Sequence, residues 1–129
     1  MAPLLVALLV AVFGGLGSIT RFVVDGVVRS RLGTAYPFGT TLINLSGALF
    51  LGFVTSLALG QVLSNDWRLL LGTGFLGGYT TFSTASFETV RLLQAGRYRA
   101  ALANGVGMLV VSVALAGAGF WLGTFIAGS

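Results

Sequence analysis

The sequence contains no cysteine, no histidine and no lysine, and these absences exclude several kinds of chemistry. Without cysteine or histidine there is no thiol nucleophile, disulfide, zinc site or histidine base. The side chains that remain cannot assemble a nucleophile–base pair or a catalytic metal cluster. We therefore predict that the protein is not an enzyme.

Charge is scarce as well. Only 8% of the 129 residues are charged and 56% are hydrophobic, whereas soluble domains carry about 25% charged residues. All seven basic residues are arginines, and they flank apolar runs instead of forming one basic stripe. This composition indicates a membrane protein with arginines at the lipid interface and no nucleic-acid partner.

The apolar runs predict an all-α membrane protein with four transmembrane helices, short loops and no soluble domain. The spans are expected at about residues 3–24, 37–60, 69–93 and 100–125, in one domain that covers residues 1–129. We expect the first span to be retained and not cleaved as a signal peptide, because no basic segment precedes it. The loop that follows it is expected to carry Arg29 and Arg31.

The third span contains an unusual stretch, GTGFLGGYTTFSTASFE, at residues 72–88. Gly77 and Gly78 are poor helix formers, and Tyr79, Thr80 and Thr81 follow them directly. In hydrocarbon a helix breaks only where protein or a water-filled cavity satisfies the freed backbone groups. Because broken helices at mid-bilayer commonly present carbonyls to a cation, we predict an ion-handling break in this span.

The second and fourth spans each carry a polar stripe. Thr40, Asn44, Ala48 and Gly52 recur every four residues, as do Asn104, Met108 and Ser112, so each set shares one helix face. An amide such as Asn44 in a membrane span either holds helices together or lines a pore, and both interpretations stay open here. The glycines of the first span, Gly14, Gly15 and Gly17, favour close helix packing.

Charged residues lie near the span ends. Arg21 and Asp25 are four residues apart, and Glu88 and Arg91 are three apart, so each pair is expected to form an ion pair along its helix. No acidic residue is expected deep in a span. This weighs against a small four-helix proton-coupled drug exporter, which needs a titratable carboxylate at mid-bilayer. A membrane assembly subunit that transports nothing is a second alternative.

Three segments, GGLGSITRF at 14–22, PFGTTLINLSGALFLG at 37–52 and the stretch at 72–88, resemble the signature segments of the CrcB/Fluc fluoride channels. The resemblance implies an antiparallel dual-topology homodimer with two pores, in a bacterial-type inner membrane. Such a dimer exports F⁻ passively. Its partners would be a second copy of the chain, the fluoride ion and membrane lipid.

The resemblance also implies roles for single residues. Main-chain carbonyls of Gly77 and Thr80 would bind a structural Na⁺ at the dimer interface. Asn44 would hydrogen-bond a phenylalanine-lined ion path or fluoride itself. The remaining expected path residues are one aromatic ring, four hydroxyl side chains and one vestibule arginine: Phe82, Ser83, Thr84, Thr40, Ser112 and Arg21.

Two features depart from this family pattern. Members usually carry a second phenylalanine three residues after the first, where this chain has Ala85. The arginines are also biased: only Arg68 is expected on the side opposite Arg21, Arg29, Arg31, Arg91, Arg97 and Arg99. By the positive-inside rule this bias predicts a single orientation with both termini outside, whereas the resemblance implies dual topology.

Overall fold

The computed structural model describes residues 1–128, which are helical throughout apart from short connections and contain no strand. The helices are α1 (Pro3–Leu32), α2 (Phe38–Leu59), α3 (Asn65–Arg68), the π-helical η1 (Leu69–Leu76), α4 (Gly77–Tyr79), α5 (Phe82–Gln94), α6 (Tyr98–Leu102), the π-helical η2 (Ala103–Gly107) and α7 (Met108–Ala127). Three continuous helices are long and apolar enough to cross a membrane: Pro3–Leu32, Phe38–Leu59 and Tyr98–Ala127. The prediction of an all-helical membrane protein is therefore confirmed.

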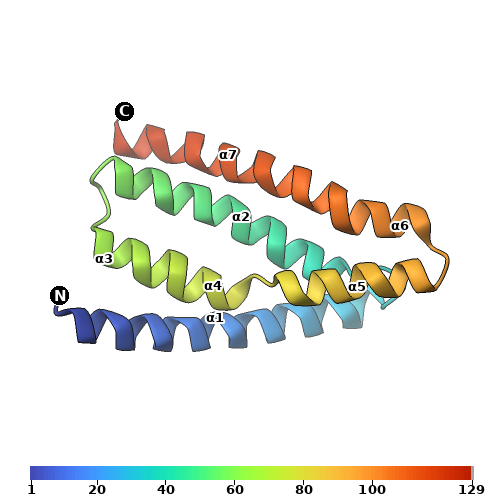
Figure 1. Ribbon diagram of the computed structural model, residues 1–129. Helices are drawn as coiled ribbons and strands as arrows, with labels where there is room; N and C mark the ends of the chain where they lie inside the picture. Colours follow the sequence, from blue (N-terminus) through green and yellow to red (C-terminus); the bar gives the residue numbers. More distant parts are fainter. Residues whose placement is uncertain (129) are drawn as a thin grey trace.

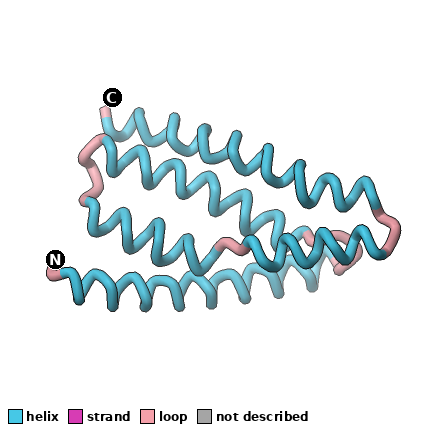
Figure 2. The backbone as a smooth tube through the Cα atoms, in the orientation of Figure 1, coloured by secondary structure: helices cyan, strands magenta, loops and turns pink. Residues whose placement is uncertain are grey.

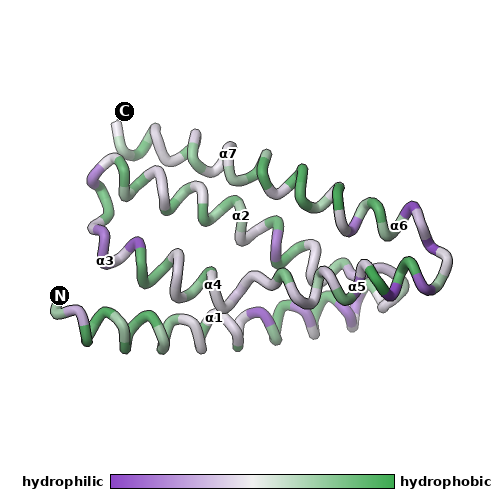
Figure 3. Tube along the Cα trace, viewed as in Figure 1, coloured by the Kyte–Doolittle hydropathy of each residue, from purple (hydrophilic) through white to green (hydrophobic). Residues whose placement is uncertain are grey.

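The long helices run side by side and form an elongated bundle (Figure 1). α2 packs mainly against α7, and α1 packs against η1 and α4. The two termini lie at the same end of the bundle as α3, and the connections after α1 and α5 lie at the other end (Figure 1). Hydrophobic residues dominate the tube along most of its length, and strongly polar ones gather near the bundle ends (Figure 3).

The interruption lies at the C-terminal end of the predicted stretch. Gly77 and Gly78 are helical in α4, whereas Thr80, with ψ of 159°, and Thr81, with φ of −146° and ψ of 121°, are extended. Figure 2 shows this pair as the loop between α4 and α5. The helix continues through the two glycines despite their low helix propensity, because at least one of them serves close packing.

That packing joins α1 to η1 and α4. A Cβ added to Gly78 would come within 2.0 Å of the Gly14 carbonyl oxygen, and one added to Gly17 within 2.0 Å of the Phe75 carbonyl oxygen. The backbones of α1 and α4 therefore approach so closely that only glycine fits at these contacts. Small residues at helix interfaces allow this approach.

α1 also differs from its expected form, because it continues to Leu32 and includes Arg29 and Arg31. Gly33, with a φ of 76°, ends it in a backbone conformation that suits glycine. The extra turns carry Asp25 four residues before Arg29, and their side chains lie 2.8 Å apart. An acidic residue placed four positions before a basic one is the favourable order on a helix.

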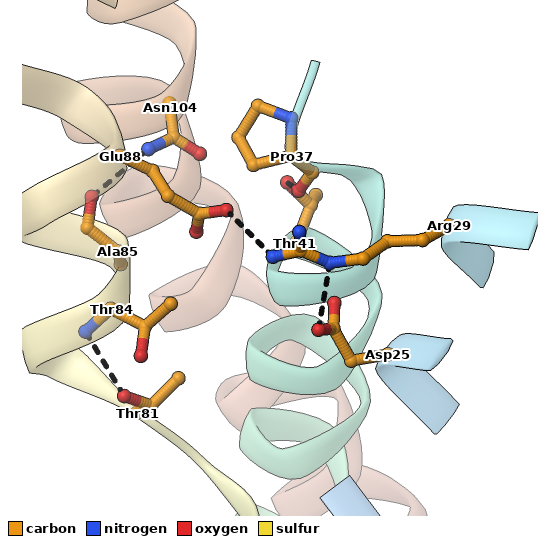
Figure 4. A network of polar contacts seen from close by, with 9 residues as sticks. All are labelled: Asp25, Arg29, Pro37, Thr41, Thr81, Thr84, Ala85, Glu88 and Asn104. Carbon is orange, nitrogen blue, oxygen red and sulfur yellow. Dashed lines mark hydrogen bonds and ion pairs between the residues drawn. The ribbon is translucent and has the colours of Figure 1, made fainter. Parts of the chain in front are cut away.

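The two expected ion pairs are not the ones formed. Asp25 pairs with Arg29 and not with Arg21, and Glu88 lies 3.7 Å from Arg29 on the neighbouring helix. Arg91 instead places its guanidinium carbon 5.9 Å from the centre of the Phe87 ring. Figure 4 shows Arg29 between the two carboxylates, so this arginine ties the end of α1 to α5.

Replacing Gly17 with alanine should destabilise the protein, because the new Cβ would meet the Phe75 backbone at 2.0 Å. Overpacking of this kind costs about 1–3 kcal/mol. Thermal unfolding in detergent, followed by tryptophan fluorescence, measures the effect. Gly26→Ala is the matched control on the same helix, because nothing lies within 4 Å of its added Cβ. Equal unfolding midpoints for the two variants would contradict the packing account.

Candidate functional site

The extended pair Thr80–Thr81 creates the site, because it frees backbone groups inside an apolar bundle. Asn44 satisfies both groups of Thr81: the Thr81 N–H donates to Asn44 Oδ1 over 2.9 Å, and Asn44 Nδ2 donates to the Thr81 carbonyl over 2.8 Å. The same Nδ2 lies 3.6 Å from the sulfur of Met108. Of the two interpretations left open for Asn44, the interhelical one describes the contacts that it makes here.

Two carbonyls lose their helical donors at the same place. In a continuous helix the Gly77 carbonyl would accept from the Thr81 N–H, and the Thr80 carbonyl from the Thr84 N–H. The first of these donors is taken by Asn44, and the second donates to Thr81 Oγ1 over 3.2 Å. Hard cations prefer oxygen ligands. The carbonyls of Gly77 and Thr80 thus fit the type of donor that the predicted Na⁺ site requires.

The neighbouring Gly78 carbonyl is satisfied from within the protomer. Ser18 Oγ on α1 donates to it over 3.3 Å. The Leu76 carbonyl accepts both the N–H and the hydroxyl of Thr80, each over 2.9 Å. The carbonyls that these contacts satisfy at the end of α4 are therefore not the two predicted Na⁺ ligands, Gly77 and Thr80.

A groove of about 480 Å³ runs beside the extended pair, and we call it the central groove. Phe82 and the small Ala85 line this groove. The second and fourth spans contribute Asn44, Met108 and Ser112, and the third span contributes Gly77 and Thr80. None of the described residues that line this groove carries a charge. Phe82 is 86% exposed, so its ring lies at the protomer surface.

A smaller hollow of about 280 Å³, the Thr40 pocket, also borders Thr81. Arg21, Thr40 and Thr84 line it together with Ser18, and Thr81 borders both spaces. Ser83 lies outside both and is exposed, with its hydroxyl 3.4 Å from Thr81 Oγ1. Apart from Ser83, the structure therefore divides the expected path residues into two groups, and Thr81 borders both.

Asn104 is a structural partner of this site that the sequence placed on a polar stripe without assigning it a role. It is 1% exposed, and its Nδ2 donates to the Ala85 carbonyl over 3.1 Å and to Thr89 Oγ1 over 2.8 Å. Figure 4 shows this contact between η2 and α5. Asn104 thus holds α5 as Asn44 holds Thr81. The available signal was the same for both residues, an amide within an apolar run.

Tyr79 is a second residue whose role the sequence did not indicate. It is 9% exposed, its hydroxyl lies 2.9 Å from Ser46 Oγ, and its ring stacks on Phe75. These contacts fix the last residue of α4 against α2. A tyrosine next to two glycines gave no sign of this in the sequence.

Comparisons with known proteins agree on one family. The model described as CrcB-like protein, Camphor Resistance (CrcB), matches residues 8–124. A protein of Leifsonia xyli subsp. xyli named fluoride-specific ion channel FluC 1 is 58% identical over 123 residues, which are 95% of this chain and 89% of the relative.

Two further relatives show how far the similarity extends. The fluoride-specific ion channel FluC 2 of Mycolicibacterium paratuberculosis is 51% identical over 118 residues, covering 92% of this chain and 90% of the relative. The fluoride-specific ion channel FluC of Thermus thermophilus is 40% identical over 121 residues, covering 94% and 97%. These matches confirm the resemblance inferred from the three signature segments: the chain belongs to the CrcB family.

Proposed function

We propose that this protein is a fluoride channel that lets F⁻ leave the cell passively across the inner membrane. Its relatives are named as fluoride-specific ion channels, a function that is not enzymatic and agrees with the prediction of no catalysis. Membrane insertion is supported by the three long apolar helices. In this proposal α3, η1, α4 and α5 together form the third of four spans.

The observation that carries the proposal is the uncharged central groove beside Thr80 and Thr81. Fluoride is small and strongly hydrated, so a pathway must offer hydrogen-bond donors in place of water. The hydroxyl of Ser112 supplies such a donor, and the positive edge of the Phe82 ring can approach an anion. A pathway without a buried arginine binds the ion weakly enough for it to leave.

The start of α5 adds to this environment. α5 begins at Phe82, Thr81 caps it by accepting from the Thr84 N–H, and Phe82 lines the groove. The N-terminus of a helix carries partial positive charge and favours anions. Asn44 would act here by fixing Thr81 and hence the direction in which α5 starts. Thr40, Thr84 and Arg21 would then serve the ion on the Thr40 pocket side.

The proposed assembly is an antiparallel dual-topology homodimer with two pores and one Na⁺ between the copies. Gly77 and Thr80 would hold the ion through their carbonyls, two from each copy, and the ion would supply the positive charge that draws these dipoles together. Exposure of Gly77 and Phe82 on the protomer supports a covering partner. The arginine bias favours a single orientation over insertion in both orientations. We prefer dual topology because of the family resemblance.

The drug-exporter alternative loses support from the placement of the acids. Asp25 and Glu88 both contact Arg29, and Asp66 contacts the terminal ammonium of Met1 at 2.9 Å. None of the three lines the central groove, and Asp25, which lines the Thr40 pocket, is paired with Arg29. A proton-coupled exporter needs a carboxylate within its substrate path.

Purified protein in liposomes should pass F⁻ and hardly any Cl⁻, because only fluoride is small enough to exchange its water for closely spaced hydroxyl donors. A fluoride-selective electrode measures release after an ionophore dissipates the membrane potential. Empty liposomes provide the baseline. Comparable Cl⁻ flux would contradict the proposal, and absence of all flux, also with phenylalanine at position 85, would favour the assembly subunit.

Ala85→Phe should raise the rate of fluoride release. Ala85 borders the central groove, where an added ring at i+3 would share a face with Phe82 and present a second positive edge. The same electrode assay measures the change. Ala85→Leu is the matched control, because it fills the groove without a ring quadrupole. Equal or lower release from the phenylalanine variant would count against an aromatic path.

Gly77→Val should weaken dimerisation while the protomer still folds. Within the protomer an added Cβ meets only the Gly72 carbonyl oxygen, at 3.9 Å, so a loss of assembly would come from the space between copies. Size-exclusion chromatography with light scattering, in sodium and in potassium buffers, measures the dimer fraction. Gly117→Val is the control, since nothing lies within 4 Å of its added Cβ. An unchanged dimer would argue against the proposed clasp.

A further inference from the structure

The bundle end opposite the termini holds a hollow of about 560 Å³, which we call the interfacial pocket. It lies where the end of α1, the loop before α2 and the later turns of α5 meet. Its lining carries three arginines and two acids: Arg29, Arg91, Arg97, Asp25 and Glu88. Because the adjoining helices are apolar, this end lies where a membrane protein meets lipid headgroups.

The positive groups of this pocket face outward more than the acidic ones do. The Arg29 side chain is 47% exposed, against 29% for Asp25 and 15% for Glu88. Arg29 contacts both carboxylates, so these three residues together keep one negative charge. With the other two arginines, the three arginines and two acids of the lining sum to a net charge of +1.

Arg91 and Arg97 are both exposed, and neither forms an ion pair within residues 1–128. Arg91 lies against the Phe87 ring, and Arg97 donates to the Ala35 carbonyl. These contacts hold the two guanidinium groups at the pocket without neutralising them. One guanidinium group can donate two parallel hydrogen bonds to a phosphate group. Two arginines at one hollow therefore suit a phosphate ligand.

Aromatic residues complete the lining. Phe38 is 45% exposed and Phe87 is 62% exposed, and Tyr36 stands beside Phe38 with ring centres 5.0 Å apart. Apolar rings next to a phosphate-binding hollow match the glycerol and upper acyl region of a lipid. A free phosphate ion would use the arginines and leave the rings unused.

We propose that the interfacial pocket binds the headgroup of an anionic phospholipid, with Arg91 and Arg97 on its phosphate and Phe38 and Phe87 against its glycerol and upper acyl chains. Basic pockets between membrane helices are known to take such headgroups. The site shares no lining residue with the central groove, and it borders the Thr40 pocket at Asp25 and Thr84. A bound lipid would join the loop before α2 to α5.

The test compares two double variants that remove the same charge from the same bundle end. Arg91→Gln with Arg97→Gln removes the pocket arginines, whereas Arg31→Gln with Arg99→Gln removes exposed arginines that do not line it. Phosphatidylglycerol or phosphatidylcholine is titrated into detergent-solubilised full-length protein. The midpoint of thermal unfolding, read from tryptophan fluorescence, reports binding to the folded state.

Phosphatidylglycerol should raise the midpoint of the unmodified protein and of the Arg31/Arg99 variant, and phosphatidylcholine should not. The pocket variant should lose about fivefold in lipid affinity for each arginine, the factor that corresponds to about 1 kcal/mol per basic residue near an anionic headgroup. Arg91→Lys with Arg97→Lys, which keeps the charge, should restore part of the shift and covers the case in which the glutamine variant does not fold.

Three results would overturn the proposal. Equal losses in the two glutamine variants would show general attraction to the basic bundle end. An equal midpoint shift with inorganic phosphate at matched ionic strength would show a site for the free anion. A shift with phosphatidylcholine as large as that with phosphatidylglycerol would show that charge plays no part.

Discussion

The structure depends on how backbone groups around Thr80 and Thr81 find hydrogen bonds inside an apolar bundle. Each buried group left without a partner costs about 1–3 kcal/mol, so an extended pair persists only where other helices supply partners. Asn44 on α2 takes both groups of Thr81, and Ser18 on α1 takes the Gly78 carbonyl. The interruption therefore brings three helices together at one point.

Close packing and polar contacts support each other at this point. Gly17 and Gly78 let α1 reach the backbone of η1 and α4, and that approach brings Ser18 within hydrogen-bond distance. Asn104 fixes α5 on the other side of the interruption. Charges lie mainly toward the bundle ends and away from the groove, where Arg29 joins α1 to α5 through two carboxylates. An uncharged groove between charged ends suits passive movement of a small anion better than proton-coupled exchange.

Much of this protein was predictable from local patterns. Hydropathy and charge indicated an all-helical membrane protein, and the stretch at residues 72–88 indicated the family and the neighbourhood of the interruption. Helix propensity marked Gly77 and Gly78 as the weakest residues of that stretch, because a scale for isolated helices counts glycine as a poor helix former. Here glycine is retained in a helix for close approach to α1, and the threonines that follow are the extended residues.

The amino-acid order alone determined that the chain is apolar, helical and a CrcB-family member. These properties follow from local hydropathy, local charge and short signature segments. Only the packed structure decided which atoms meet. Asn44 and Thr81 are 37 positions apart, and Ser18 and Gly78 are 60 apart. Arg29 and Glu88, which lie 3.7 Å from each other, are 59 positions apart. Partners so distant along the chain are selected by the crossing of helices, a geometry that no periodicity within one helix encodes.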